Sequence, residues 1–359
     1  MQEGALDASV SPETPWVVVG LDNGGTCNNA TVLTDAGEFL VDRLVENPSR
    51  VNDGPEVAVA SLAASLEAII DLTGVPRMYV RAVGLDTPGP ASAEGIISSK
   101  GATNFSEAEW HGFDFRGALE ARLGLPVVYN NDGNAAALYA HHAYYGERAS
   151  EHSSVSAIVG TGLGGGVVEA GRIVKGAAGM AGELGHVHIP MDGLLADGQP
   201  TPTCNCGFVG DAESVASLSG IERNLLPFWL TQYPGHPLTG VNPRIAARQV
   251  RTLGEQGDPL ALEIFEQQAG AIGRLFTIAS NFIDPNVYFV GGGVVETTPE
   301  FREWFLSRVR ANTALRGEQI DVAHFAIVPD LDMAGARGAA IAARTIVIGT
   351  PDFAGTADQ

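Results

Sequence analysis

The sequence predicts an α/β protein that consists of two related halves. Apolar, β-branched runs typical of buried strands alternate with segments of helical periodicity along most of the chain. The same order of elements, a strand pair around a glycine turn followed by alternating helices and strands, occurs twice. With 359 residues and 45% hydrophobic content, the chain is long enough to form two domains with large cores.

The first half begins with a predicted meander of three strands joined by two tight turns, at 16–22, 28–35 and 37–45. Helices and strands then alternate, with a helix at 56–74, a strand at 78–86, a helix at 115–124 and a strand at 126–130. A further helix is predicted to open near Asp132, directly after the last of these strands.

The second half repeats this order. A strand pair at 154–174 surrounds a glycine turn, and strands at 286–293 and 321–328 follow, separated by helices. The helix at 333–347 is rich in small residues, which allow close approach, so we expect it to return and pack on the first half. The predicted organisation is a disordered tail, a small N-terminal domain and a large C-terminal domain, at 1–15, 16–135 plus 331–359, and 136–330.

Charge and composition exclude several classes of function. A net charge of −21 repels phosphate backbones and anionic lipid surfaces, so neither nucleic acid nor a membrane is expected as a partner. No apolar stretch is long enough for a membrane helix, and the N-terminus lacks the pattern of a secretion signal. Three cysteines cannot form a disulfide framework, which fits a reducing cytoplasm. We therefore expect a cytoplasmic protein that acts on a small molecule.

Three glycine-rich turns at strand ends predict phosphate binding. They are DNGGT at 22–26, GTGLGGG at 160–166 and GGG at 291–293. Backbone N–H groups without obstructing side chains can surround a phosphate. One such turn alone is most simply a tight hairpin, but three at equivalent places in two halves are stronger evidence. None fits the dinucleotide fingerprint or the phosphate loop that ends in Gly-Lys-Ser/Thr.

Seven motifs, in order, carry a resemblance to a known family. They are DNGGT, TPGP, NNDGNAAA, GTGLGGG, AGELGH, CNCGFVGDAES and DPNVYFVGGG. Over roughly residues 17–347 the sequence resembles a sugar kinase of the ROK family, which contains bacterial glucokinases and belongs to the actin-like ATPase superfamily. The resemblance implies two domains of ribonuclease-H-like topology, with an interdomain cleft that holds a sugar and ATP. Dimers are common in such kinases, so a homodimer stays open.

Asp132 is the predicted catalytic base. Phosphoryl transfer to a hydroxyl needs an in-line acceptor, a base for its proton, and donors or Mg²⁺ to bear the phosphate charge. Asp132 follows a strand and opens a helix, so a helix N-cap is the alternative role for it. Its place in NNDGNAAA, which matches the family's catalytic motif, favours catalysis. Asn131 would bind a sugar hydroxyl.

The resemblance also implies residues for Mg²⁺ and ATP. Asp22 ends the first strand and resembles the acid that organises Mg²⁺ through water. Cys27 stands where many relatives carry a lysine or another polar residue, a change that weakens the expectation for triphosphate binding. The glycine turns would line the phosphates through Gly24, Gly25, Thr26, Gly160, Thr161, Gly162 and Gly164, and would approach the adenosine through Gly291 and Gly292.

Sugar recognition needs side chains that both donate and accept hydrogen bonds, because a buried hydroxyl left unpaired costs roughly 1–3 kcal/mol. The family's sugar-binding asparagine corresponds to Asn104, in a segment that is longer than usual before Trp110. The match adds Glu183 and His186 from AGELGH and Glu213 from DAES. For each of these the alternative is a solvated loop residue.

A weakened zinc site is the last motif. In the family, the histidine of E-x-G-H and three cysteines of C-x-C-G-x-x-G-C bind a structural zinc ion, and the matching residues here are His186, Cys204, Cys206 and Asp211. Aspartate is an acceptable zinc ligand, so a closed tetrahedron remains available to these four residues. The alternatives are a metal-free loop and a site in which His188 replaces a ligand.

Taken together, the residues and the resemblance predict an ATP-dependent kinase of a hexose or hexose-like polyol, acting at the primary hydroxyl, with glucose as the default acceptor. A second interpretation is a C7-cyclitol kinase, of the valiolone type, in an aminocyclitol pathway, which would explain the altered DNGGTCNN and zinc motifs. A third is a sugar sensor without catalysis, which the presence of Asp132 disfavours. The family's DNA-binding repressors carry an N-terminal helix-turn-helix, for which the tail before Trp16 has no room.

Overall fold

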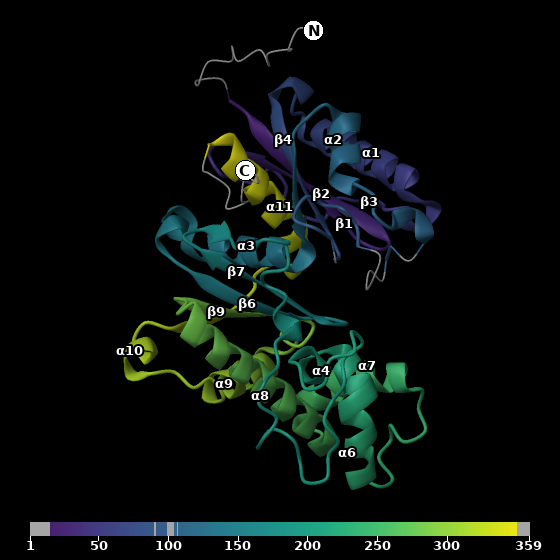
Figure 1. The fold of residues 1–359 in the computed structure, drawn as a ribbon, viewed down its shortest axis with the longest axis vertical. Coiled ribbons are helices and arrows are strands. Elements are labelled where there is room, and N and C mark those ends of the chain that lie inside the picture. The colour runs from purple at the N-terminus through teal and green to yellow at the C-terminus, as the bar shows by residue number, and fades with distance from the viewer. Residues whose placement is uncertain (1–14, 90, 99–103, 106, 350–359) are drawn as a thin grey trace.

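The protein is described here by a computed structural model, which covers residues 15–89, 91–98, 104–105 and 107–349. Within these residues the chain forms two five-stranded mixed sheets, one in each half, surrounded by helices (Figure 1). The predicted α/β class is confirmed. The tail predicted at 1–15 lies outside the described residues except for Pro15, and so do residues 350–359.

The first sheet has the strand order β3-β2-β1-β4-β5. Its strands are β1 (Val17–Asn23), β2 (Cys27–Thr34), β3 (Glu46–Pro48), β4 (Val80–Thr87) and β5 (Val127–Asn131). β1 pairs antiparallel with β2 and parallel with β4, and β4 pairs parallel with β5. The carboxyl ends of β1, β4 and β5 therefore meet at one edge of the sheet.

The strand predicted at 37–45 is wrong. This segment is irregular apart from a bridge between Phe39 and Leu33, and the strand that pairs with β2 is β3, which begins at Glu46. Leu40 and Leu44 are exposed, whereas Val41 and Val45 pack against the core of the first half. The alternation of apolar residues thus marks burial on one side, which an irregular loop satisfies as well as a strand does.

Helices cover both faces of the first sheet. Alternate side chains of a strand point to opposite faces, and in β1 Val19 and Leu21 share a core with α1 (Pro55–Thr73) and α2 (Phe115–Leu123). Val18 points the other way, into a core shared with α3 (Asp132–Tyr145) and α11 (Leu331–Val347). α1 starts with a proline at its first position and stops at Gly74, which adopts the left-handed conformation.

The second sheet has the order β10-β9-β6-β7-β8. Its strands are β6 (Ser154–Val159), β7 (Leu163–Glu169), β8 (Arg172–Ile173), β9 (Val287–Gly292) and β10 (His324–Ile327). β6 pairs antiparallel with β7 and parallel with β9. Its two neighbours therefore repeat the arrangement around β1.

The largest core lies between the second sheet and helices that lie between β8 and β10 in sequence. These helices are α4 (Glu213–Ala216), α5 (Leu218–Gly220), α6 (Leu226–Gln232), α7 (Pro243–Glu255), α8 (Pro259–Phe282) and α9 (Pro299–Ala311). The short helix α10 (Gly317–Ile320) buries no residue. α8 begins where the side chain of Asp258 accepts the backbone N–H of Ala261. Among the described residues, no helix is both long enough and apolar enough to span a bilayer.

The helix α11 packs closely on the first half, as expected from its small residues. A Cβ added to Gly20 would lie 1.9 Å from the carbonyl oxygen of Ala336, and one added to Gly84 would lie 1.9 Å from that of Ala339. In Figure 1, α11 (yellow) lies beside β1 and β4 although it comes from the far end of the chain. Small residues are required here because the helix and strand backbones nearly touch.

Candidate active site

Three aspartates gather at the carboxyl edge of the first sheet. Asp22 and Asp86 occupy paired positions on the adjacent parallel strands β1 and β4, and Asp132 begins α3 directly after β5. A Cβ on Gly335 of α11 would lie 2.9 Å from an oxygen of Asp86 and 3.1 Å from an oxygen of Asp22. The backbone of α11 therefore lies directly against both carboxyl groups.

In the structure, Asp132 is not the residue that caps helix α3. The N-cap of α3 is Asn131, whose side-chain oxygen accepts the backbone N–H of Asn134 at 2.7 Å. Asp132 is the first helical residue, and its side chain reaches solvent. One of its oxygens accepts the N–H of Gly133 at 2.7 Å. Because Asn131 already caps the helix, the Asp132 carboxylate is available for another partner.

Burial sets the charge state of the three aspartates. It raises the pKa of Asp22 to about 6, against a hydrogen bond from Asn29 that lowers it, and the charge of Asp132 raises it further. Burial, followed by the charges of Asp22 and Asp132, raises the pKa of Asp86 well above its ordinary value. The protein atoms that crowd Asp132 also raise its pKa, although the side chain touches solvent on one side. The cluster therefore resists carrying three full negative charges.

Asp86 is a residue that the sequence analysis missed. It is fully buried, and neither of its carboxyl oxygens finds a hydrogen-bond partner in the part of the chain that the structure describes. It directly precedes the TPGP motif, which we used only for the family resemblance. A signal was present, because an aspartate at the end of an apolar strand is unusual in a core. The pairing of β4 with β1, which places it beside Asp22, could not be seen.

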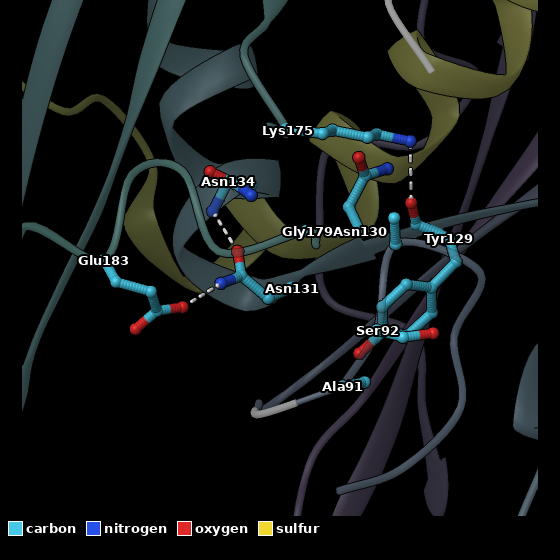
Figure 2. Close-up of a pocket in the computed structure, with 10 residues that line it drawn as sticks. Ala91, Ser92, Tyr129, Asn130, Asn131, Asn134, Lys175, Gly179 and Glu183 are labelled. Carbon is cyan, nitrogen blue, oxygen red and sulfur yellow. Dashed lines mark hydrogen bonds between the residues drawn. The ribbon is translucent and has the colours of Figure 1, made fainter. Parts of the chain in front are cut away.

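The predicted acceptor residues come together around Asn131. The side-chain N–H₂ of Asn131 donates to Glu183 at 2.9 Å, and both residues line a pocket between the first sheet and the segment that follows β8 (Figure 2). Glu183 also raises the pKa of Asp132 by its charge, although burial is the larger cause. Asn131, Asp132 and Glu183 thus form one site from two distant segments.

Two further predicted sugar ligands lie against the glycine turns. Asn104 lies beside Gly25, since a Cβ added there would be 2.8 Å from the Asn104 side-chain oxygen. Glu213 lies beside Gly162, and its carboxylate accepts the backbone N–H of Leu163 at 2.9 Å. These contacts connect acceptor candidates to the two turns predicted to hold phosphate.

A backbone hydrogen bond closes each of the first two glycine turns. The N–H of Gly24 donates to the carbonyl of Cys27, and that of Gly160 donates to the carbonyl of Gly162, both at 2.9 Å. The remaining predicted phosphate residues reach solvent at least in part, and these are Gly25, Thr26, Thr161 and Gly164. These residues are therefore accessible to a ligand, although Gly164 also pairs with Ile158 in the second sheet.

The third glycine run is buried. Gly291 packs against Val328, and Gly292 packs against Val159 with a φ of +91°, a conformation that favours glycine. The next residue, Gly293, is partly exposed. Contact of Gly291 and Gly292 with adenosine stays a prediction.

The four predicted zinc ligands do form one cluster. The ligand atoms of His186, Cys204, Cys206 and Asp211 all lie within 4.8 Å of one another. From Nδ1 of His186 the distances are 3.3 Å to Asp211, 3.6 Å to Cys206 and 3.9 Å to Cys204. Zinc–ligand distances of about 2.0–2.3 Å place the corners of a tetrahedron about 3.3–3.8 Å apart, so these residues fit zinc.

The cluster also contacts an acceptor candidate. Burial raises the pKa of the Cys204 thiol, which donates to a carboxylate oxygen of Glu213 at 3.1 Å. His188 is exposed, its ring lies tilted against that of Phe208, and it is not a member of the four-residue cluster. His186 therefore lies within the four-residue cluster, and Glu213 lies between that cluster and the second glycine turn.

The pocket in Figure 2 includes polar residues that the sequence analysis did not select. Asn130, Asn134 and Lys175 line it together with Asn131 and Glu183. Asn130 and Asn134 were visible within NNDGNAAA, but only the strand and helix geometry shows that both are buried beside the pocket. The ammonium group of Lys175 donates to the backbone carbonyl of Tyr129 at 3.1 Å, a contact without a sequence signal.

Comparison with known proteins identifies the family of this chain. The model of the ROK family matches residues 18–346. A glucokinase from Halalkalibacterium halodurans is 32% identical over 283 residues, which cover 77% of this chain and 80% of the relative. An N-acetyl-D-glucosamine kinase from Citrobacter koseri is 30% identical over 286 residues, which cover 78% of this chain and 84% of the relative.

A solved structure agrees in fold. A ROK family glucokinase from Streptomyces griseus, in complex with glucose and AMPPNP, is 28% identical with a TM-score of 0.66, and the match covers 92% of this chain and 99% of that chain. The predicted two-part, actin-like ATPase fold is therefore confirmed. The family match spans nearly all of both sheets and every motif from DNGGT to the helix at 331–347. The chain belongs to the ROK family.

Proposed function

We propose that this protein transfers the γ-phosphoryl group of ATP to the primary hydroxyl of a hexose, with glucose as the first acceptor to test. It is a carbohydrate kinase, the enzyme class of its glucokinase and N-acetylglucosamine kinase relatives. The single observation that carries the proposal is the placement of Asp132. Its carboxylate is not needed as a helix cap and stands beside Asn131 and Glu183.

In this proposal Asp132 takes the proton of the attacking hydroxyl. Its raised pKa makes it a stronger base than an ordinary aspartate, and its exposed side lets a substrate reach it. Asn131 and Glu183 would orient the ring, since their mutual hydrogen bond leaves further donors and acceptors on both groups. Asn104, His186 and Glu213 would complete the acceptor set.

The donor side would use backbone amides and Asp22. Open glycine turns supply N–H groups to phosphate oxygens without steric obstruction, and Thr26 and Thr161 add hydroxyl groups at the two turns. Mg²⁺, the usual counter-ion of ATP, would neutralise charge between the phosphates. Asp22 would orient its water shell from the end of β1. Gly291 and Gly292 remain the candidates for the adenosine side.

The cluster of His186, Cys204, Cys206 and Asp211 would hold a structural zinc ion, which would supply rigidity rather than chemistry. The Cys204–Glu213 contact suggests what that rigidity serves, because Glu213 is also an acceptor candidate. Two other expectations stay predictions. They are the domain boundary after residue 135 and a homodimer.

An assay of ATP consumption across acceptors tests the proposal. Glucose, mannose, N-acetylglucosamine, N-acetylmannosamine and a valiolone-type cyclitol would be compared, each with the Asp132→Asn variant as a blank. We expect turnover with a hexose that depends on Asp132. No comparison specifically supports the C7-cyclitol acceptor, so turnover of the cyclitol alone would replace the hexose proposal. Absence of turnover with tight sugar binding would favour a sensor.

A further inference from the structure

The pocket beside Asn131 contains polar groups that the proposed catalytic set does not use. Its lining includes Asn130 and Asn134 from the β5–α3 junction and Lys175 from the second half. Figure 2 shows Asn130 and Lys175 on the side of Asn131 that is away from the Glu183 carboxylate, whereas Asn134 lies above Asn131 in this view. The pocket therefore continues the acceptor site rather than the phosphate turns.

Asn130 has an unusual environment. It is only 3% exposed, yet neither its side-chain oxygen nor its side-chain nitrogen has a hydrogen-bond partner among the described residues. The side-chain oxygen of Asn134 is likewise buried and unpaired within that part of the chain. Buried amides are nearly always paired, by protein, water or ligand. The Asn134 oxygen packs against Gly166 and Gly182, since a Cβ added to either would lie within 3.0 Å of it. The Asn130 amide therefore points to an occupant that the chain itself does not supply.

The groups around Asn130 define the chemistry of that occupant. Glu183 already accepts from Asn131, and the Lys175 ammonium already donates to the Tyr129 carbonyl. The pocket thus has one acidic and one basic neighbour, both engaged, which favours an uncharged group. An asparagine amide donates and accepts, so its best partner also does both.

The remaining wall combines small residues with Ser92 and Tyr129. Gly179 has a φ of +77°, and a Cβ there would lie 2.6 Å from the backbone nitrogen of Ala93, so the loop that carries Gly179 lies directly on that segment. Both hydroxyl groups of this wall are engaged elsewhere, since that of Tyr129 pairs with Thr87 at 2.8 Å and that of Ser92 donates to Glu94 at 2.6 Å. Neither of them therefore satisfies the Asn130 amide.

From this geometry we propose that the pocket is a subsite for one uncharged substituent of the acceptor ring, a hydroxyl or a carboxamide, that hydrogen-bonds to Asn130. The inference rests on the proposed function, because it assumes a sugar bound at Asn131. Asn130 then determines specificity at one ring position and takes no part in the transfer itself.

Deoxy analogues test the inference. The kcat/KM for glucose and its 1-, 2-, 3- and 4-deoxy forms would be measured for the unmodified protein and for Asn130→Leu. We expect Asn130→Leu to lower kcat/KM for glucose about tenfold or more. For one deoxy analogue, which lacks the group that Asn130 binds, the loss should shrink to within about twofold. N-acetylglucosamine then distinguishes a hydroxyl from a carboxamide as the group that Asn130 binds. If Asn130 binds a carboxamide, Asn130→Leu should also lower kcat/KM for N-acetylglucosamine.

Two further variants keep the test decisive. Asn130→Asp is nearly the same size, removes the two N–H donors, and serves where Asn130→Leu folds poorly. Thr31→Val removes another buried, unpaired polar group, on β2 and outside the pocket lining, and should affect no acceptor selectively.

Two outcomes with Asn130→Leu would overturn the inference. An equal loss of kcat/KM with every analogue would mean that Asn130 has a structural role. No loss with any sugar would mean that water alone fills the pocket. If the unmodified protein neither binds nor phosphorylates any hexose, the proposed function fails and this inference with it.

Discussion

The strand pairs that open the two halves share a backbone plan but present different chemistry. In each, two antiparallel strands flank a glycine turn, and the first strand pairs in parallel with a later one, β4 for β1 and β9 for β6. β1 and β4 carry the paired aspartates Asp22 and Asp86, each one residue before the end of its strand. The equivalent pair on β6 and β9 is Val159 and Gly292, which carry no charge.

This difference shows how a repeated fold can divide one reaction. The acidic edge of the first sheet can handle protons and cations, whereas the second turn offers little except backbone and the contact with Glu213. The duplication therefore predicts where ligands approach, but not which chemistry each half contributes. The predictions below test that division.

The largest effect should follow from the acidic edge. We expect Asp132→Asn to lower kcat by about 10²–10⁴-fold, as for loss of a general base, while calorimetry still detects sugar binding. Asp42→Asn, a change at an exposed position of the 37–45 segment, is the matched control and should keep normal turnover. Near-normal kcat in Asp132→Asn would mean that the first half does not supply the catalytic base. That result would contradict the proposed difference between the two halves.

The acidic edge should also affect stability in a pH-dependent way. The folded-state pKa of Asp22 is raised from 3.8 to about 6, so its contribution to stability is fully present below about pH 4 and is lost as the pH rises through about 6. In metal-free buffer, Asp22→Asn should have no advantage near pH 4 but a free energy of unfolding about 1–3 kcal/mol larger than the unmodified protein near pH 8. Urea unfolding across this range measures it. An advantage that is independent of pH would contradict the assigned cause.

The second turn should respond to a small added side chain. A Cβ on Gly162 would lie 2.5 Å from a carboxylate oxygen of Glu213, so Gly162→Ala should displace that group and raise the KM for the sugar about five- to tenfold, with a smaller effect on the KM for ATP. Gly24→Ala, in the first turn, is the matched comparison, because its Cβ would meet the backbone of Cys27 instead. Its main effect should be on ATP. If each variant changed the KM for sugar and the KM for ATP equally, the proposed difference between the two turns would be contradicted.

The metal cluster should give the smallest kinetic effect. We expect about one zinc ion per purified chain, tighter zinc binding in Asp211→Cys and looser binding in Asp211→Ala, because thiolate is a stronger zinc donor than carboxylate. Loss of metal should raise the KM for sugar roughly two- to fivefold, and more than that for ATP, through Glu213. His188→Ala is the control for zinc content. Elemental analysis that finds metal-free, fully active and stable protein would show that this loop holds its shape by packing alone.

Much of the fold could be predicted because local signals agreed with the tertiary packing. The helix at 56–74 was predicted within one residue, since Pro55 and Gly74 mark its ends. The strand at 37–45 failed because alternation reports one-sided burial, and the hydrogen bonds that distinguish a strand from a loop depend on a partner elsewhere. The cluster of His186, Cys204, Cys206 and Asp211 was selected from the family resemblance, and the structure brings its members together.

The unpredicted parts of the candidate site depend on strand order and burial. Asp86 lies beside Asp22 only because β4 is inserted between β1 and β5. Asn131 rather than Asp132 caps α3, a shift of one residue that sequence patterns do not resolve. Asn130 reads as an ordinary residue of a short strand, and its unpaired amide follows from the packing around it.

The close packing of α11 on β1 and β4 has a consequence for synthesis on the ribosome. Gly20 and Gly84 of the first sheet contact the backbone of α11 directly. The first sheet therefore stays without its packing partner until residues 331–347 have been synthesised. At 5–20 residues per second, translation of residues 132–330 takes on the order of 10–40 s. During that time one apolar face of the nascent first half, including Val18 and Ala82, has no cover from α11. Until α11 has been made, the nascent chain therefore depends on chaperones, or on aggregation being slow, to reach its folded state.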